Sequence, residues 1–176
     1  MPKKVLKGLV LAITIILITL SFSGCDQIMD LIGMGDDDTE LNSNQILLKK
    51  LLGAMDKSTQ EIQAYSQAHN SEGYPAFLPD GFMYTDSGNV RTRTFTNYTN
   101  ADGAVLNGTD KITFGGTPPM GGIVAGDMDI TFSGAYIGST KNLVLKKSRT
   151  PPAPMTCTEC KVDGVDMKAD FISMQQ

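Results

Sequence analysis

Two nine-residue stretches of the chain share the pattern G-x-x-x-I-T-F-x-G: GTDKITFGG at 108–116 and GDMDITFSG at 126–134. In the second copy polar residues alternate with Met128, Ile130 and Phe132. Alternation with a period of two is the pattern of a strand that buries one face. The glycines flank each strand and do not cluster at a strand-to-helix turn, so neither copy resembles a phosphate-binding loop. The segment GTPPMGG between the copies is typical of a loop that joins antiparallel neighbours.

Most of the chain after residue 90 has a similar strand-like composition, in short runs separated by turn residues. We predict strands at 90–99, at 104–108 leading into the first copy, and around KNLVLKK. A further strand is predicted at 165–171, where apolar and charged residues alternate. Residues 74–90 are rich in Pro, Gly, Asp and Ser and are interpreted as an irregular connector.

One segment, 42–70, has the periodicity of an amphipathic helix. Its apolar stripe recurs at steps of three and four residues: Leu48, Leu51, Leu52, Met55, Ile62 and Tyr65. Asn42 followed by Gln45, or else Ser43 or Asn44 as the capping residue, is a plausible start. The sequence therefore predicts an α+β fold, in which one N-terminal amphipathic helix packs on a curled antiparallel β-sheet. That sheet is expected to be a meander or partial barrel of about five to seven strands.

Residues 1–24 have the order of a secretory signal peptide. Lys3, Lys4 and Lys7 come first, an apolar run follows at 9–20, and small residues close the segment. The apolar run is shorter than the ~20 residues that a membrane-spanning helix needs. A retained N-terminal anchor helix is the alternative interpretation.

The end of this segment, Phe22-Ser23-Gly24-Cys25, resembles the lipobox of bacterial lipoproteins. In that family the cysteine is diacylated on sulfur and becomes the N-terminus after cleavage. Leucine is usual three positions before the cysteine, and Phe22 is more similar to relaxed lipoboxes. The resemblance implies lipidation at Cys25 and attachment to a membrane of the cell envelope, on the periplasmic face or the cell surface. An ordinary signal peptide with an incidental cysteine is the alternative.

The charge distribution separates an acidic segment from a nearly neutral remainder. Six of the 19 Asp and Glu residues, and none of the Lys and Arg, lie at 26–40, so residues 25–42 are expected to be a lipidated cysteine and a solvated tether. Residues 43–176 are then a single helix-plus-sheet domain. Because the chain from Leu41 onward carries 12 basic and 13 acidic residues, it has no electrostatic footprint for nucleic acid.

Few residues suggest chemistry, so we predict a non-enzymatic binding or structural module without a metal or cofactor, acting on an unknown protein or apolar ligand. His69 is the only histidine and is expected at the surface near the helix end. Asp127 and Asp129 share the polar face of a strand, where solvated surface is expected. The alternative function is a carrier of apolar or lipid ligands whose cavity is lined by Ile, Phe and several methionines: Met55, Met83, Met120, Met128, Met155, Met167 and Met174.

The segment TCTEC holds the two remaining cysteines, Cys157 and Cys160. An even pair in an exported protein favours a disulfide, here one that pins a turn. Free thiols, a redox motif or a metal site are the alternatives. A redox C-x-x-C lies at the start of a helix, whereas a proline-rich stretch precedes this one and a strand-like stretch follows it. Zinc would need two more ligands, which His69 alone cannot supply.

Overall fold

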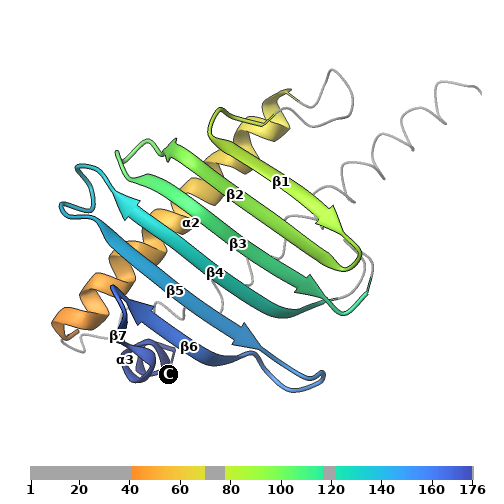
Figure 1. Cartoon of the computed structure of the whole chain (residues 1–176), viewed down its shortest axis with the longest axis vertical. Coiled ribbons are helices and arrows are strands. Elements are labelled where there is room, and N and C mark those ends of the chain that lie inside the picture. Colours follow the sequence, from red (N-terminus) through yellow and green to blue (C-terminus); the bar gives the residue numbers. More distant parts are fainter. Residues whose placement is uncertain (1–40, 70–77, 117–121, 176) are drawn as a thin grey trace, which may run out of the picture.

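The computed structural model describes residues 41–69, 78–116 and 122–175, which form a long helix and a single antiparallel sheet (Figure 1). The sheet has seven strands in the order in which they occur along the chain. The elements are α2 (Ser43–His69), β1 (Phe82–Ser87), β2 (Val90–Thr99), β3 (Val105–Phe114), β4 (Ile123–Ser133), β5 (Lys141–Ser148), β6 (Thr156–Val162), β7 (Val165–Asp166) and α3 (Lys168–Ser173). The predicted α+β class, with a helix on an antiparallel meander, is confirmed.

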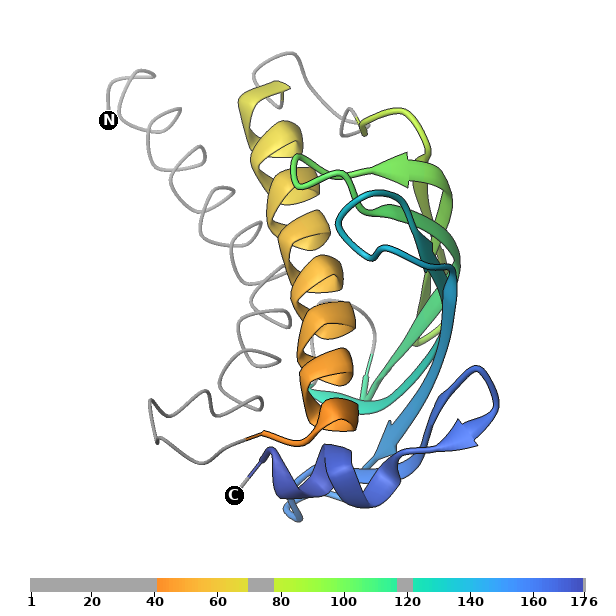
Figure 2. The same ribbon diagram turned by 90° about the vertical axis from the view of Figure 1, so that its left-hand side faces the viewer.

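The helix α2 lies in the concave side of the curled sheet and crosses its strands (Figure 2). Its 27 residues span about 40 Å at 1.5 Å per residue. The side chains that it buries are Leu48, Leu51, Leu52, Ala54, Met55, Ser58, Thr59, Ile62 and Ser66. Tyr65, predicted to belong to this stripe, is 39% exposed. The stripe continues from Ile62 by a step of four to Ser66, which leaves Tyr65 beside it.

The two copies of the repeat are the neighbouring strands β3 and β4, as predicted. They run antiparallel with Gly108 opposite Ile130 and Ile112 opposite Gly126. Gly108 has a positive φ of 132°, and a Cβ there would collide with the carbonyl oxygen of Asp129. The glycine that opens the first copy is therefore needed for close approach to β4, whereas a Cβ on Gly126 would meet no described atom within 4 Å.

The concave face of the sheet and the helix share one hydrophobic core. Leu106, Ile130, Phe132 and Leu143 are fully buried on it. Phe95 and Tyr98 also belong to this core, although a strict period of two would put them on opposite faces. The register of β2 against β3 shifts between these two residues, so a β-bulge turns both rings to the same side.

Two sequence predictions about secondary structure were wrong. The connector predicted at 74–90 contains β1, which pairs with β2 along its whole length. The two strands are joined by Gly88 and Asn89, and Gly88 has a φ of 59°. Such a two-residue turn with glycine is a strong hairpin signal, which the abundance of turn residues in the segment concealed.

The strand predicted at 165–171 is in fact the two-residue strand β7 followed by helix α3. The backbone N–H of Lys168 donates to Oδ1 of Asp166 (2.9 Å), and the N–H of Phe171 donates to the carbonyl of Met167 (2.9 Å). Met167 and Phe171 are both buried. They are four residues apart, a spacing that lies on one face of a helix as readily as on one face of a strand.

The start of α2 is held by a cap that also reaches α3. Oδ1 of Asn42 accepts the backbone N–H groups of Asn44 (2.9 Å) and Gln45 (3.0 Å), and Oε1 of Gln45 accepts the N–H of Asn42 (2.8 Å). Asn42 and Asn44 also donate from their side chains to the carboxylate of Asp170 (2.8 and 2.9 Å). The predicted cap at Asn42 with Gln45 is confirmed, and the two ends of the domain meet there.

Replacing Asn42 by alanine is expected to lower the free energy of unfolding by about 1 kcal/mol, because two N–H groups lose their acceptor. Urea denaturation followed by circular dichroism would measure the change. Asn44→Ala is the matched control, since it removes a bond to Asp170 and leaves the cap. An equal loss in both variants would show that the contact with α3, and not the cap, holds the helix start.

Candidate functional site

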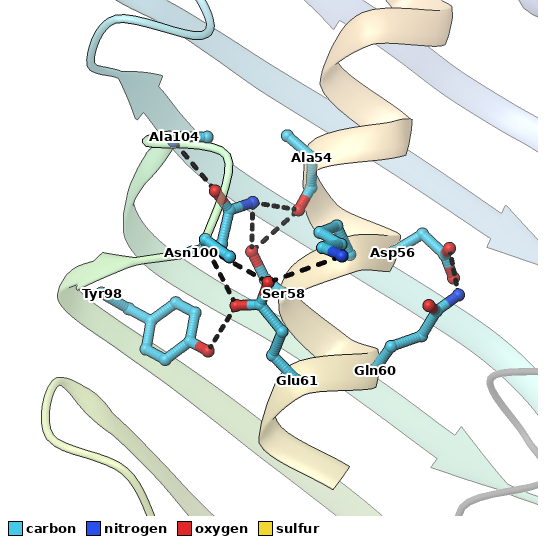
Figure 3. A network of polar contacts seen from close by, with 10 residues as sticks. Ala54, Asp56, Ser58, Gln60, Glu61, Tyr98, Asn100 and Ala104 are labelled. Carbon is cyan, nitrogen blue, oxygen red and sulfur yellow. Dashed lines mark hydrogen bonds and ion pairs between the residues drawn. The ribbon is translucent and has the colours of Figure 1, made fainter. Parts of the chain in front are cut away.

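A buried asparagine joins helix α2 to the turn between β2 and β3 (Figure 3). Nδ2 of Asn100 donates to the carbonyl of Ala54 (3.2 Å) and lies 3.2 Å from Oγ of Ser58. Its Oδ1 accepts the backbone N–H of Ala104 (2.9 Å). Ser58 in turn donates to the carbonyl of Ala54 (2.8 Å). Every polar atom of the Asn100 side chain is thus used to hold the turn against the helix.

Glu61 and Tyr98 extend this network toward the surface (Figure 3). The Tyr98 hydroxyl lies 3.5 Å from Oε2 of Glu61, and both carboxylate oxygens of Glu61 lie 3.1 Å from the backbone nitrogen of Ala101. Burial, together with the charge and hydrogen bond of Glu61, raises the pKa of Tyr98 to about 12. The carboxylate is engaged with backbone and phenol, so the network is structural in character.

Tyr98 should make the protein less stable in alkali. Its folded pKa of about 12 lies above the ordinary value of 10.0, so the stability that it contributes is present below pH 10 and is lost as the pH rises through 12. The free energy of unfolding of the native protein should fall more steeply over that range than that of Tyr98→Phe. Urea titrations at several alkaline pH values would measure the difference. Parallel curves for the two proteins would contradict the raised pKa.

A charged pair lies buried on the concave face between β2 and β3. Nε of Arg93 donates to Oδ2 of Asp110 at 2.8 Å, and Nη2 of the same arginine also contacts that oxygen. The two residues are 7% and 4% exposed. Neither residue was predicted from the sequence to be buried, although the arginine lies two positions before the inward-facing Phe95 on the same strand. That spacing was the available signal for a charge facing the core.

Lys147 of β5 lies on the same face, two strands from Asp110. Its Nζ is 4.7 Å from the centre of the Phe171 ring of α3. Burial lowers the pKa of Lys147, while the charges of Cys157, Cys160 and Asp110 oppose that shift. A lysine held against an aromatic ring gains a cation–π interaction, and here that contact ties α3 to the sheet.

Cys157 and Cys160 are free, buried thiols on β6. Cys157 is opposite Lys147 and Cys160 is opposite Leu145, with a register shift between Lys146 and Lys147. The predicted disulfide would pin a turn, whereas the structure places the pair inside a strand that the sequence analysis did not predict. Residues 158–160 of β6 lie opposite only two residues of β5, Lys146 and Leu145. This extra residue forms a β-bulge, which turns both cysteines to the concave face.

The raised pKa values of these thiols argue against an activated catalytic cysteine at this position. Burial raises the pKa of Cys157, and burial with the neighbouring Cys157 raises the pKa of Cys160 to about 12. A reactive cysteine needs a lowered pKa, because the thiolate is the nucleophile and the metal ligand. The pair therefore lacks the environment that lowers the thiol pKa in a redox motif.

The convex face carries charged residues of both signs on neighbouring strands. Asp127 and Asp129 are exposed, as expected. Asp127 lies opposite Lys111 on β3 and Lys146 on β5, and Lys146 forms an ion pair with Glu159 at 3.0 Å. Hydrogen bonds from Lys161 and Lys146 lower the pKa of Glu159 to about 2. Charges of alternating sign across neighbouring strands stabilise the sheet and remain solvated.

The single histidine and the methionines have ordinary environments. Nδ1 of His69 lies 2.8 Å from the carbonyl of Tyr65, and the two rings stack at 4.1 Å. This exposed position at the end of α2 agrees with the expected surface location. Three of the methionines proposed to line a cavity, Met55, Met128 and Met167, belong to the common core, whereas Met83 is 55% exposed.

Other predicted features fall partly or wholly outside the described residues. The signal segment, Cys25, Met120 and the tether up to residue 40 lie there. Within 41–69, 78–116 and 122–175, no three His, Cys, Asp or Glu residues converge as a metal site would require. In the same ranges no helix has the length and apolar character to cross a membrane.

Comparison with known proteins adds no assignment. No protein family, curated protein or solved structure matches this chain.

Proposed function

We propose that this protein is a lipid-anchored component of a bacterial cell envelope, whose folded domain is a non-enzymatic binding or structural module. The observation that carries the proposal is the segment FSGC at 22–25, after a basic start and an apolar run and before an acidic stretch. Acylation at Cys25 would attach the chain to a membrane on the periplasmic face or at the cell surface. Several acyl chains on one terminus give stable anchoring.

The arrangement of the domain supports a module without catalysis. Helix α2 occupies the concave face of the sheet with its apolar stripe. The buried charges Arg93 and Asp110 satisfy each other, and Glu61 holds a turn. A partner would therefore meet the convex face and the loops, where exposed polar side chains and lysine–carboxylate pairs lie.

A carrier of apolar ligands is the second candidate, and the shared core makes it less favoured. Met55 on the helix and Met128 on the sheet belong to one cluster of buried residues. A ligand on the concave face would have to displace α2 from side chains that are already buried, at a cost of about 25 cal/mol for each Å² of apolar surface exposed. Native mass spectrometry of protein purified from cells tests this: repeated recovery of a bound lipid would favour the carrier.

The anchor is tested by intact-mass analysis of the membrane fraction. We expect a mature chain that begins at Cys25 and carries acyl mass, and we expect Cys25→Ser to lose both the acyl mass and the membrane association. Phe22→Leu, which creates the commoner lipobox, is the matched control and should be processed at least as well as the native chain. A native chain that begins at residue 25 without acyl groups would overturn the proposal.

A further inference from the structure

The bulge in β6 changes what the sequence C-x-x-C means. In an uninterrupted strand, residues three apart lie on opposite faces and about 10 Å from each other at 3.3 Å per residue. Here Cys157 and Cys160 lie opposite Lys147 and Leu145, which are only two residues apart on β5. The two cysteines therefore share the concave face, separated by roughly the 6.6–6.8 Å that two strand residues span.

A similar bulge occurs in β2, where side-chain contacts show its effect. Phe95 and Tyr98 are also three residues apart, with a register shift between them, and they lie opposite Gly108 and Leu106. Their rings pack edge to face on the concave side, with centroids 6.1 Å apart. A bulge in this sheet thus brings side chains at positions i and i+3 into mutual contact.

We propose that Cys157 and Cys160 become joined by an intramolecular disulfide after export, so that the bulge of β6 is a site of oxidative modification. The proposal rests on the proposed function only for the oxidising compartment. A disulfide needs Cα atoms between 4.4 and 6.8 Å apart. The spacing set by the bulge lies at the upper end of this range, so a small contraction of β6 closes the bond.

The reaction needs a disulfide-bearing oxidant, such as an exported thiol oxidase or oxidised glutathione. One cysteine loses its proton and attacks a sulfur of the oxidant, which releases one thiolate and leaves a mixed disulfide. The second cysteine loses its proton and attacks the first, forming the Cys157–Cys160 bond and releasing the other thiolate. Two electrons pass to the oxidant, which becomes a dithiol or two thiols.

Cys157 is the better placed of the two to attack first. Burial raises the pKa of its thiol, but the charges of Lys147 and Lys168 act in the opposite direction. Cys160, in contrast, is completely buried. Its carbonyl accepts the N–H of Met167 (2.8 Å), next to the start of α3. The second step therefore occurs at the point where β6 meets the C-terminal helix.

The test is alkylation of the full protein taken from the envelope, unfolded without reductant and analysed by mass spectrometry of the peptide that contains both cysteines. We expect no label before reduction and two labels after it. Two labels before reduction, in a chain whose acylated Cys25 shows that it was exported, would overturn the disulfide and leave the proposed function standing. A disulfide between chains or a stable mixed disulfide would also overturn it.

A second arm does not depend on export. Purified, reduced protein is exposed to oxidised glutathione, and we expect the same loss of both labels even if Cys25 proves not to be acylated. The geometric control carries Cys157→Ser and Cys160→Ser together with Lys141→Cys and Val144→Cys, a pair with the same spacing on a part of β5 that has no register shift. This control should keep two labels. Equal oxidation of both pairs would contradict the role of the bulge.

Discussion

Replacing Asp110 by alanine is expected to lower the free energy of unfolding by about 3–5 kcal/mol, the largest effect of any polar substitution considered for this domain. The variant leaves the guanidinium of Arg93, which is only 7% exposed, without the carboxylate that it contacts on β3. A buried cation that loses the carboxylate opposite it is no longer compensated for much of the cost of its removal from water. Urea denaturation at neutral pH measures the loss.

Two controls separate the pair from its surroundings. Arg93→Met with Asp110→Leu removes both charges and should recover most of the stability, because an apolar pair of similar volume is often as stable as a buried ion pair. Asp86→Ala breaks the more exposed pair with Arg91 (2.8 Å), and such pairs contribute about 0–1 kcal/mol. If Asp86→Ala cost as much as Asp110→Ala, burial would not be the source of the effect.

Asn100→Ala is expected to cost about 2–4 kcal/mol, because several hydrogen bonds are lost and the buried N–H of Ala104 is left without its acceptor. The side chain of Asn100 is 3% exposed, so water can replace these bonds only with difficulty. Thermal and urea unfolding would measure the loss. The helix and the turn are far apart in sequence, so the variant should also loosen α2 from the sheet, which hydrogen exchange of the α2 amides would report.

A double-mutant cycle with Ser58→Ala measures how much of this loss comes from the contact between the side chains of Ser58 and Asn100. The loss in the double variant should be smaller than the sum of the single losses, since Ser58 and Asn100 contact each other (3.2 Å). Asn107→Ala is the matched control on the same hairpin, where the side chain accepts the exposed N–H of Asn97. A cost for Asn107→Ala equal to that for Asn100→Ala would contradict the importance of burial.

The features that could be predicted from the sequence are those encoded by local periodicity. The helix at 42–70 was recognised within one residue at each end, because its apolar stripe and the cap at Asn42 are contiguous in sequence. The pairing of the two repeat copies was also predictable, since each shows one apolar face and a loop rich in glycine and proline joins them. In these places local preference and tertiary packing agree.

What could not be predicted depends on register. Assigning faces by a period of two fails beyond a bulge. A strict period would put Phe95 and Tyr98 on opposite faces, and the disulfide of Cys157 and Cys160 was predicted to pin a turn, whereas a bulge in each strand turns the pair to one face. Asn97, with a φ of 53°, is the local sign of the first bulge, since asparagine tolerates this conformation better than most residues. That sign alone does not tell which side chains face the core.

The partners of buried polar residues also could not be predicted from local sequence patterns. Arg93 on β2 contacts Asp110 on the neighbouring strand β3, and Asn100 contacts a helix more than 40 residues earlier in the chain. The spacing of Arg93 from Phe95 can indicate its face, but nothing local in the sequence indicates which residue is its partner, and polar residues such as Asn100 are common in turns. Their importance follows only from burial, because an unsatisfied polar group in the core is costly.

The order of the strands determines how this domain can assemble as it is made. Every strand pairs with the next one in the chain, so each can find its neighbour across a short loop, with little loss of chain entropy. A chain that emerges N-terminus first can therefore add the strands one by one. Helix α2 is made before all of them, and it can pack only once the sheet has formed. The contact between Asn42 and Asp170 joins residues 128 positions apart, so it can form only after α3 has been synthesised. A chain truncated before α3 would thus retain its hairpins but lack the contact that closes the fold.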